Sequence, residues 1–492
     1  MFKKSRTVIY LLIIIAFLMM SACTSTAATT AAAASTQGST TNQTTTIDSQ
    51  ATAGAPGGVP PSGSQPGAPG GAPPSGSQPG GAPSSDTYVS TSTGAYTVDG
   101  TTVSQSGQTY TAANADESAV YVINAGNLTL TNATITSSGA SSSSDYSSFY
   151  GLNAGVLANF ASTINLSDST VTTSGDGANG VFTEGAGTSV TLSNVTINCT
   201  GQYAHAVMAT NTSSMTLTNV NMTTAGGSSG AIATDRGSGT ITATGGTVTT
   251  TGNNSPGIYS TGVITVTGAT IKSTGSEAAV IEGGNTIILN DSSLTSTKEG
   301  KWGVMIYQSM SGDAAGTDGT FTMTGGSLSY TSATGPLFYV NNSTALITLK
   351  GVDLTVGSGT LINAAAGDWG TSGSNGGTVV LTADSQTLNG NMTADSISSL
   401  TITLQNSSSL KGAINAENTA KAASLTLDAS SNWTVTADSY LTTLTDTAGI
   451  SGSSISNIYG SGFTVYYDSS ANTSLGGKTY TLNGGGTLTP AS

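Results

Sequence analysis

The chain has 492 residues, of which 7% are charged and 36% are hydrophobic, and its formal net charge is −14 at pH 7. Average globular domains carry about 25% charged residues, and disordered chains combine low hydrophobicity with high net charge, so highly charged disorder is excluded. The good helix formers Glu, Lys, Gln and Arg are scarce, which also excludes a helical fold. Arg236 is the one arginine after position 6, and without clustered basic side chains we expect no binding to nucleic acid.

Residues 1–22 have the features of a bacterial lipoprotein signal peptide. Basic residues precede an apolar stretch from Val8 to Met20, and small residues then lead to Cys23. The apolar stretch is too short to span a bilayer comfortably but fits the central region of a signal peptide. The sequence Met20-Ser21-Ala22-Cys23 resembles a lipobox, in which the cysteine is acylated. We therefore expect lipidation at Cys23 and a membrane-anchored protein that faces outward from a bacterial cell envelope; an ordinary cleaved signal peptide is the alternative.

Residues 23–86 predict a flexible tether behind the lipidated cysteine. Nine of the 12 prolines lie between positions 56 and 83, and PPSGSQPG occurs at both 60–67 and 73–80. A segment of this composition buries too little apolar surface to fold and behaves as a flexible, partly extended linker. The tether would hold the rest of the chain away from the membrane, although simple low-complexity filler is the alternative.

From residue 87 onward the sequence repeats with a period near 25 residues. Nine copies of one strand, typified by LTLTNATI at 128–135, begin at residues 128, 164, 190, 215, 241, 264, 287, 321 and 347. Apolar residues alternate with Thr or Ser, which predicts strands with one buried face, and Asn, Asp or Gly follows where a tight corner needs left-handed backbone. A second strand precedes each copy. The sequence therefore predicts an all-β parallel β-helix solenoid over 87–410 with about 25 residues per coil, then less regular coils and a cap over 411–492.

These repeats resemble the right-handed parallel β-helix proteins of the pectate-lyase-like superfold, and among them the adhesin-type repeat passengers of bacterial surfaces. The segment SSNWTVTADSYLTTL at 430–444 is similar to the late coils of such passengers. The resemblance implies a non-catalytic role in surface adhesion or recognition, with a glycan or a protein as partner. The same fold carries polysaccharide lyases and hydrolases, so a polysaccharide-active enzyme is the alternative.

Acidic residues in one column of coils are the candidates for such an enzyme. Aligned coils place Glu184 and Asp235 in one column, two coils apart, and Glu282 one position off that column two coils later. Stacked positions two coils apart are separated by ~10 Å, near the upper limit for the paired carboxylates of an inverting hydrolase. We interpret these residues as solvated charges at turns, with a local pair between Asp235 and Arg236, and we expect no catalytic residue.

Other residues able to support catalysis or metal binding have structural interpretations. His205 aligns with corner positions of other coils, and Cys199 aligns with an inward column of Ser and Thr. The insertion at 312–320 carries Asp313 and Asp318, which fall short of the six to eight oxygen ligands of Ca²⁺. We therefore expect no metal and no cofactor.

Two tryptophans lie where they could contact a ligand. Trp369 lies on a polar insertion at 364–377, and Trp302 lies at a corner of the solenoid. Trp369 is the candidate sugar contact, and packing back onto the solenoid wall is the alternative.

The strand that precedes each repeat copy predicts a binding face. If Val181 points inward, the next residue points outward, and the corresponding column carries large apolar side chains. The candidate face consists of Phe182, Met208, Tyr259, Ile281, Met305 and Phe338. An uncovered apolar stripe of this length would mark an interaction surface; a covering segment, or a strand shifted by one residue, is the alternative.

Outward threonines recur in pairs, for example at 129/131 and 216/218. Such pairs resemble the flat threonine arrays of some ice-binding proteins. Threonine is also a favoured residue on the solvated face of any strand, so ice binding is a remote further alternative.

Overall fold

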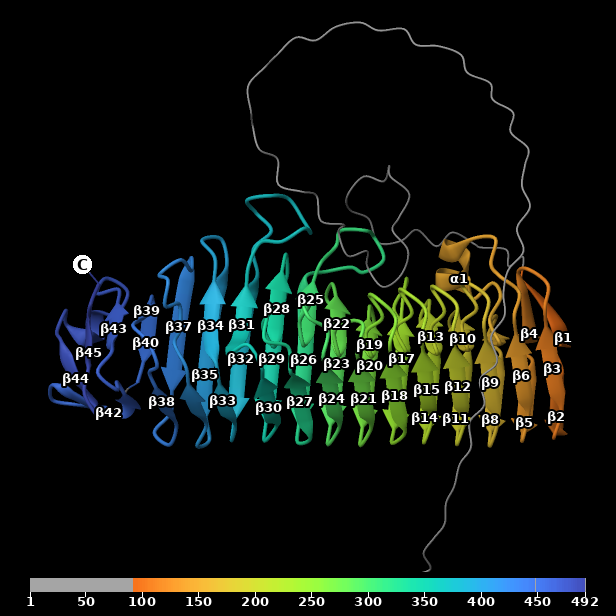
Figure 1. The fold of residues 1–492 in the computed structure, drawn as a ribbon, viewed down its shortest axis with the longest axis horizontal. Coiled ribbons are helices and arrows are strands. Elements are labelled where there is room, and N and C mark those ends of the chain that lie inside the picture. Colours follow the sequence, from red (N-terminus) through yellow and green to blue (C-terminus); the bar gives the residue numbers. More distant parts are fainter. Residues whose placement is uncertain (1–91, 447, 492) are drawn as a thin grey trace, which may run out of the picture. The chain divides into compact units, whose positions relative to one another are not determined.

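The structure is a computed structural model that describes residues 92–446 and 448–491. The predicted signal peptide, the lipidation site Cys23 and the tether lie outside these residues. The described part forms an all-β parallel β-solenoid of about 16 turns, with about 25 residues per turn (Figure 1). The predicted fold class is confirmed. None of the helices in the described part is long and apolar enough to cross a membrane.

Three long parallel sheets form the walls of the solenoid, and successive coils add neighbouring strands to each sheet. Sheet A contains β1 (Thr93–Asp99), β4 (Glu117–Ile123), β7 (Val156–Ala158), β10 (Val181–Glu184), β13 (Val207–Thr210), β16 (Ile232–Thr234), β19 (Ile258–Ser260), β22 (Ala279–Glu282), β25 (Val304–Tyr307), β28 (Phe338–Asn341), β31 (Thr360–Ala364) and β34 (Asn391–Ala394). Sheet B contains β2 (Thr102–Ser106), β5 (Asn127–Thr131), β8 (Thr163–Ser167), β11 (Ser189–Ser193), β14 (Ser214–Thr218), β17 (Thr240–Thr244), β20 (Val263–Thr267), β23 (Thr286–Asn290), β26 (Asp318–Thr324), β29 (Thr344–Lys350), β32 (Thr378–Asp384), β35 (Ser399–Gln405), β37 (Ala422–Leu427) and β40 (Thr443–Thr445). Sheet C contains β3 (Thr109–Ala112), β6 (Thr134–Ser137), β9 (Thr170–Thr173), β12 (Thr196–Cys199), β15 (Asn221–Thr224), β18 (Thr247–Thr250), β21 (Thr270–Ser273), β24 (Ser293–Ser296), β27 (Ser327–Tyr330) and β30 (Asp353–Val356).

A fourth sheet, D, forms the last coils and closes the carboxy-terminal end. It contains β33 (Thr387–Asn389), β36 (Ser409–Lys411), β38 (Asn432–Thr434), β39 (Ser439–Leu441), β41 (Ile450–Ser451), β42 (Ser454–Tyr459), β43 (Thr464–Tyr467), β44 (Tyr480–Asn483) and β45 (Thr487–Pro490). A short 3-10 helix, η1 (Thr473–Leu475), precedes β44. The pairs β41–β42 and β44–β45 are antiparallel, so the chain turns back on itself at this end.

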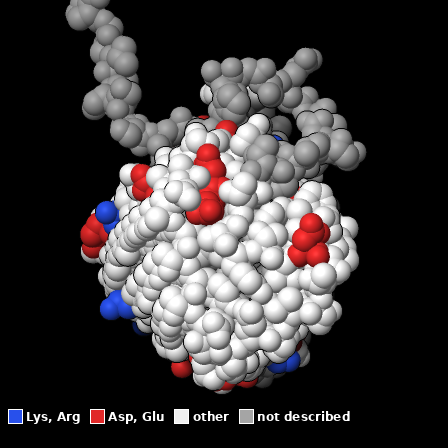
Figure 2. Space-filling view, turned by 90° about the vertical axis from the view of Figure 1, so that its right-hand side faces the viewer, with Lys and Arg blue, Asp and Glu red and all other residues white. Residues whose placement is uncertain are grey.

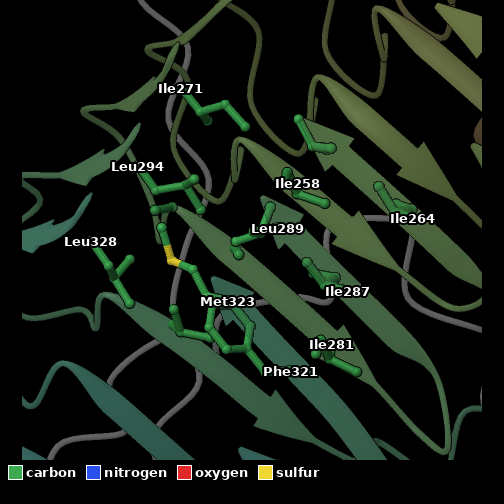
Figure 3. Close-up of a cluster of buried hydrophobic side chains, with 14 of the residues drawn as sticks. Ile258, Ile264, Ile271, Ile281, Ile287, Leu289, Leu294, Phe321, Met323 and Leu328 are labelled. Atoms are coloured by element: carbon green, nitrogen blue, oxygen red, sulfur yellow. The ribbon is translucent and has the colours of Figure 1, made fainter. Parts of the chain in front are cut away.

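The alternating sequence places apolar residues inside the solenoid and threonines outside it. In β5, Leu128 and Leu130 are fully buried, and Leu128 pairs in register with Ile164 of β8. Further along, Figure 3 shows aliphatic and aromatic side chains from several strands meeting in the interior. Each such buried side chain stabilises the fold by about 1.5–3 kcal/mol, which accounts for a stable core in a chain with few charges.

Left-handed residues form the corner between sheets B and C, as the sequence predicts. Asn132 and Asp168 have φ angles of 53° and 50°, and Gly245 occupies the same corner with a φ of 66°. The Asn194 amide on the next coil donates to Asp168 Oδ1 at 3.0 Å. The corner residues thus link neighbouring coils as well as turn the chain.

A column of glycines marks the corner that follows sheet C. Gly175, Gly201, Gly226, Gly252 and Gly275 occupy it on successive coils. A Cβ atom built on Gly226 would lie 1.8 Å from the carbonyl oxygen of Gly201. The coils therefore approach one another too closely here for any side chain.

Three insertions leave the regular coil beside sheet A. The first carries α1 (Ser144–Tyr150), whose N-cap Ser143 accepts a hydrogen bond from the Tyr146 N–H. The second and third are the loops 308–317 after β25 and 365–376 after β31. Figure 1 shows all three projecting from the same side of the solenoid.

Candidate functional site

A second apolar cluster lies on the outer surface of sheet A. One side chain per coil points away from the interior, and these side chains pair in register from coil to coil. This outer column consists of Tyr121, Leu157, Phe182, Met208, Ala233, Tyr259, Val280, Met305 and Tyr339. The prediction of a stacked apolar column on this strand is therefore correct for Phe182, Met208, Tyr259 and Met305.

The predicted column is wrong at two positions. Ile281 and Phe338 belong to the interior cluster, and Figure 3 shows Ile281 among the interior side chains. Val280 pairs with Tyr259, and Tyr339 pairs with Met305, so these two residues take the outward places. The predicted alignment is displaced by one residue at these two positions because an apolar residue, Val280 or Tyr339, stands directly beside Ile281 and Phe338.

This face is covered, as the alternative of a covering segment expected, and it is not an exposed binding face. Phe182 and Met208 are fully buried, and Tyr259 and Met305 are 1% and 6% exposed. The α1 insertion lies over part of the column, since a Cβ atom built on Gly151, which follows α1, would lie 2.5 Å from Cγ of Phe182. The outer column is therefore a second core beneath the insertions.

Arg236 connects two of the covering insertions. Its guanidinium carbon lies 3.8 Å from the ring centroid of Phe149 in α1, and its Nη2 atom lies 3.1 Å from Asp313 Oδ1 in the loop 308–317. The predicted pair with Asp235 is wrong for the side chain, since the guanidinium pairs with Asp313. Asp235 Oδ1 instead accepts from the backbone N–H of Arg236 at 2.7 Å. Phe149 is further held by Thr210, whose hydroxyl donates to its carbonyl oxygen at 3.0 Å.

Beneath the loop 308–317, Glu282 is fully buried and binds four hydroxyl groups. Its Oε2 atom accepts from the hydroxyls of Tyr259 and, at 2.8 Å, Tyr307. Its Oε1 atom accepts from Ser309 and, at 3.3 Å, Ser311. Burial raises the pKa of Glu282, although the hydrogen bonds from Ser309 and the two tyrosines act in the opposite direction. The carboxyl group thus fastens the loop to sheet A.

Asp235 lies near this group and is 2% exposed. The interpretation of Asp235 and Glu282 as solvated charges at turns is therefore wrong, because insertions beside sheet A cover both carboxyl groups. Burial raises its pKa well above the ordinary value, and the charges of Asp313 and Glu282 act in the same direction. The structure thus brings Asp235, Glu282 and Asp313 together, and we call these three residues the acidic cluster. Glu184 lies apart: its Oε1 accepts from Asn211 at 3.1 Å, and partial burial raises its pKa.

Asp313 was not predicted to belong with the carboxylates of the solenoid wall. It comes from an insertion, outside the repeat period, and it meets Arg236 across 77 residues of sequence. The one available signal was the coincidence of a lone arginine with an acidic insertion in a chain with only 7% charged residues. Within the described residues, no group of three His, Cys, Asp or Glu side chains has the geometry to hold a metal ion.

His205 and Cys199 are buried in the solenoid wall, and their surroundings are structural. His205 Nδ1 lies 2.9 Å from the carbonyl oxygen of Gly230, and burial lowers its pKa to about 4. Burial raises the pKa of the Cys199 thiol to about 12, so the thiolate nucleophile is scarce at neutral pH. The interpretation of Cys199 as a core residue is confirmed.

Both candidate tryptophans pack on tyrosines of sheet A and remain partly exposed. The Trp302 ring stacks on Tyr339 with centroids 4.2 Å apart and planes 11° apart. Trp369 lies 5.3 Å from Tyr307 with the planes tilted by 49°. Trp369 thus packs onto the wall, as the alternative expected, and the residue remains partly exposed.

The comparisons with known proteins assign no family. No protein-family model, curated protein or solved structure matches the chain.

The buried carboxyl groups predict that the fold is more stable in mild acid than at neutral pH. A carboxyl whose pKa is higher in the folded chain takes up a proton on folding. Its stabilising contribution is complete below the unfolded pKa, near 4, and is lost as the pH rises through the folded pKa. Asp235 and Glu282 are carboxyl groups of this kind. Thermal melting of the protein, followed by circular dichroism, should therefore give a higher Tm at about pH 5 than at about pH 8.

Two substitutions test the source of this pH dependence. Asp235→Asn keeps an acceptor for the Arg236 N–H but cannot ionise, so it should raise the Tm at about pH 8 and flatten the slope. The exposed control Asp353→Asn should leave the slope unchanged. An unchanged slope in Asp235→Asn would exclude Asp235 as its source.

Below about pH 4 the Tm should instead fall as the pH falls. Burial acts to raise the pKa of Asp428, but hydrogen bonds from Asn406, Ser431 and Ser430 outweigh burial and lower this pKa to about 2. The stability that the ionised Asp428 provides is therefore lost as the carboxylate takes up a proton.

Proposed function

We propose that this chain is a lipid-anchored surface protein whose β-solenoid acts in adhesion or recognition without catalysing a reaction. In this proposal the chain is an adhesin-like relative of the right-handed β-helix proteins, anchored through Cys23 and held off the envelope by the segment 23–86. Its partner is a glycan or a protein at the cell surface.

The observation that supports a non-catalytic role is the engagement of the acidic cluster. Both oxygens of Glu282 are occupied by hydroxyl donors, and Asp313 is paired with Arg236. A hydrolytic carboxyl pair must reach the glycosidic oxygen and a water molecule, whereas these carboxyl groups bind side chains that hold the covering insertions.

The surface of the solenoid also supports recognition of an uncharged or weakly charged partner. Figure 2 views the end at which β1 lies and shows mostly uncharged surface, with acidic and basic groups in small separate patches. The strand faces of sheets B and C present mainly Thr, Ser and Asn, such as Thr216 and Thr242. A long face of short polar side chains provides many hydrogen-bonding groups at regular spacing.

The membrane anchor gives a direct prediction. Cys23→Ala removes the thiol that would be acylated and should move the protein from the membrane fraction to the soluble fraction of the envelope or the medium. Detergent phase partitioning measures the shift, and Ser21→Ala, which leaves the cysteine in place, is the matched control. If Cys23→Ala still partitions with detergent, the lipoprotein assignment is wrong.

The full-length chain carrying Cys23→Ala also serves to test the function. Arrays of glycans and of host matrix proteins should yield a saturable ligand. Incubation with pectin, alginate and host glycans should release no shortened oligosaccharide. Release of such products by the pure protein would replace the recognition proposal with the polysaccharide-active enzyme.

A further inference from the structure

Two tryptophans at the surface of sheet A lie over one part of the outer column. Trp302 stacks on Tyr339, which follows Met305 in the outer column. Trp369 packs on Tyr307, the residue at the end of β25. Both indoles border the second apolar cluster and are partly exposed, whereas the third tryptophan, Trp433, is fully buried in the interior. The covered face thus ends in an aromatic surface beside the loop 365–376.

This surface is rigid, because both rings are supported from below. The interplanar angle of 11° between Trp302 and Tyr339 shows that one indole face rests flat on a buried phenol ring. The loop that carries Trp369 crosses the same phenol, since a Cβ atom built on Gly367 would lie 2.5 Å from the Tyr339 hydroxyl. That loop is held in turn by Asn375, whose amide donates to the carbonyl oxygens of Gly367 and Trp369 at 2.8 and 2.9 Å. Rigid aromatic side chains bind a ligand with little loss of conformational entropy.

Polar groups surround the aromatic surface. Asp395 Oδ2 accepts from the backbone N–H of Ala366 at 2.7 Å. Burial raises the pKa of Tyr339 to about 12, and the charges of Asp368 and Asp395 add to this effect. On the other side, Lys301 Nζ lies 5.7 Å from the Trp302 ring centroid. An aromatic floor with a few polar groups at its rim is typical of sites that bind small polar ligands.

The charges at this surface select among polar ligands. Asp368 is exposed, and Lys301 is already paired with Glu277 Oε1 at 3.7 Å. The whole chain is acidic, with a formal net charge of −14. An anionic ligand would meet uncompensated carboxylates, whereas a neutral ligand with hydroxyl donors can bind them. The negative faces of indole rings attract the weakly positive C–H groups of a pyranose ring.

Resting on the proposed role in recognition, we propose that Trp302 and Trp369 form a binding site for a neutral glycan. One or two pyranose rings stack on the exposed indole surface, and their hydroxyl groups donate to Asp368 at the rim. Tyr339 and Tyr307 act as positioning residues, since they support the indoles from below.

The test titrates the full-length chain carrying Cys23→Ala with cellohexaose, chitohexaose and mannohexaose, and with hexagalacturonate as the anionic counterpart. Tryptophan fluorescence and isothermal titration calorimetry report binding. At least one neutral hexasaccharide should bind and shift the emission. Trp302→Ala and Trp369→Ala should each weaken binding at least tenfold, and Asp368→Asn should weaken it less.

Matched variants separate binding from folding. Trp302→Tyr keeps a ring stacked on Tyr339 and should retain part of the affinity even if Trp302→Ala loses stability. Trp433→Phe changes the buried tryptophan and should leave affinity unchanged. Full affinity in both Trp302→Ala and Trp369→Ala would overturn the site, as would binding of hexagalacturonate alone or of none of the three neutral hexasaccharides. If the glycan site is overturned but a matrix protein binds on the arrays, the proposed role in recognition still stands. Release of shortened sugars would overturn the proposed role in recognition, but not the glycan site.

Discussion

Gly226→Ala is expected to destabilise the solenoid by at least about 3 kcal/mol, in the upper range for overpacked positions. The new methyl group would lie 1.8 Å from the Gly201 carbonyl oxygen, and Gly252 on the following coil approaches Gly226 just as closely. The clash is with backbone on the neighbouring coil, so no side-chain rotation relieves it. Both coils would have to separate, which breaks ladder hydrogen bonds. Equilibrium unfolding in guanidinium chloride, followed by circular dichroism, measures the loss.

The adjacent glycine supplies a matched control. A Cβ atom on Gly227 would meet its nearest neighbour, the Asn253 carbonyl oxygen, at 3.6 Å, which is an ordinary contact. Gly227→Ala should therefore change the unfolding free energy by less than about 1 kcal/mol. If the two substitutions change the unfolding free energy equally, the close approach of the coils at Gly226 does not explain why this position carries no side chain.

The double substitution Phe182→Ser and Tyr259→Ser is expected to lower the Tm by many degrees. Truncating a buried aromatic side chain costs about 3–5 kcal/mol, and both residues are almost completely buried beneath insertions. Loss of the Tyr259 hydroxyl also removes one of the donors to Glu282. Differential scanning calorimetry measures the effect directly.

Two exposed aromatic residues provide the comparison. Tyr459 and Phe463 are 41% and 37% exposed, so Tyr459→Ser with Phe463→Ser should change the Tm by only a few degrees. If the Phe182 and Tyr259 double variant keeps its Tm but loses a binding partner, the outer column is an exposed interface after all.

The amino-acid sequence was sufficient to predict the coil and most of its interior. Within sheet B, strict alternation of apolar residues with threonine leaves one way to bury the strand, so Leu128 and Leu130 are inside as predicted. The strands of sheet A are apolar on both faces. Ala279, Val280 and Ile281 stand in succession, and periodicity alone cannot decide which of them points inward. The one-residue shift at Ile281 and Phe338 follows from that ambiguity.

The acidic cluster could be predicted only in part. Glu282 ends the repeating strand β22 and Asp235 directly follows β16, so coil alignment brings them near one another. Asp313, Ser309 and Ser311 lie on an insertion with no counterpart in other coils, so no period relates them to the solenoid wall. The burial of the cluster depends on how that insertion folds back, which is a long-range contact that local sequence patterns do not encode.

The link made by Arg236 changes how the solenoid should respond to force. In a simple solenoid each coil contacts its neighbours alone, so pulling at one end peels off one coil at a time. Here α1 contacts both β10 and β13, and the ion pair of Arg236 with Asp313 joins the coil of β16 to the loop after β25. The coils between β7 and β25 are thus clamped across several repeats and must yield together. A chain pulled from its amino-terminal end would release its first coils singly and then resist as one mechanical block.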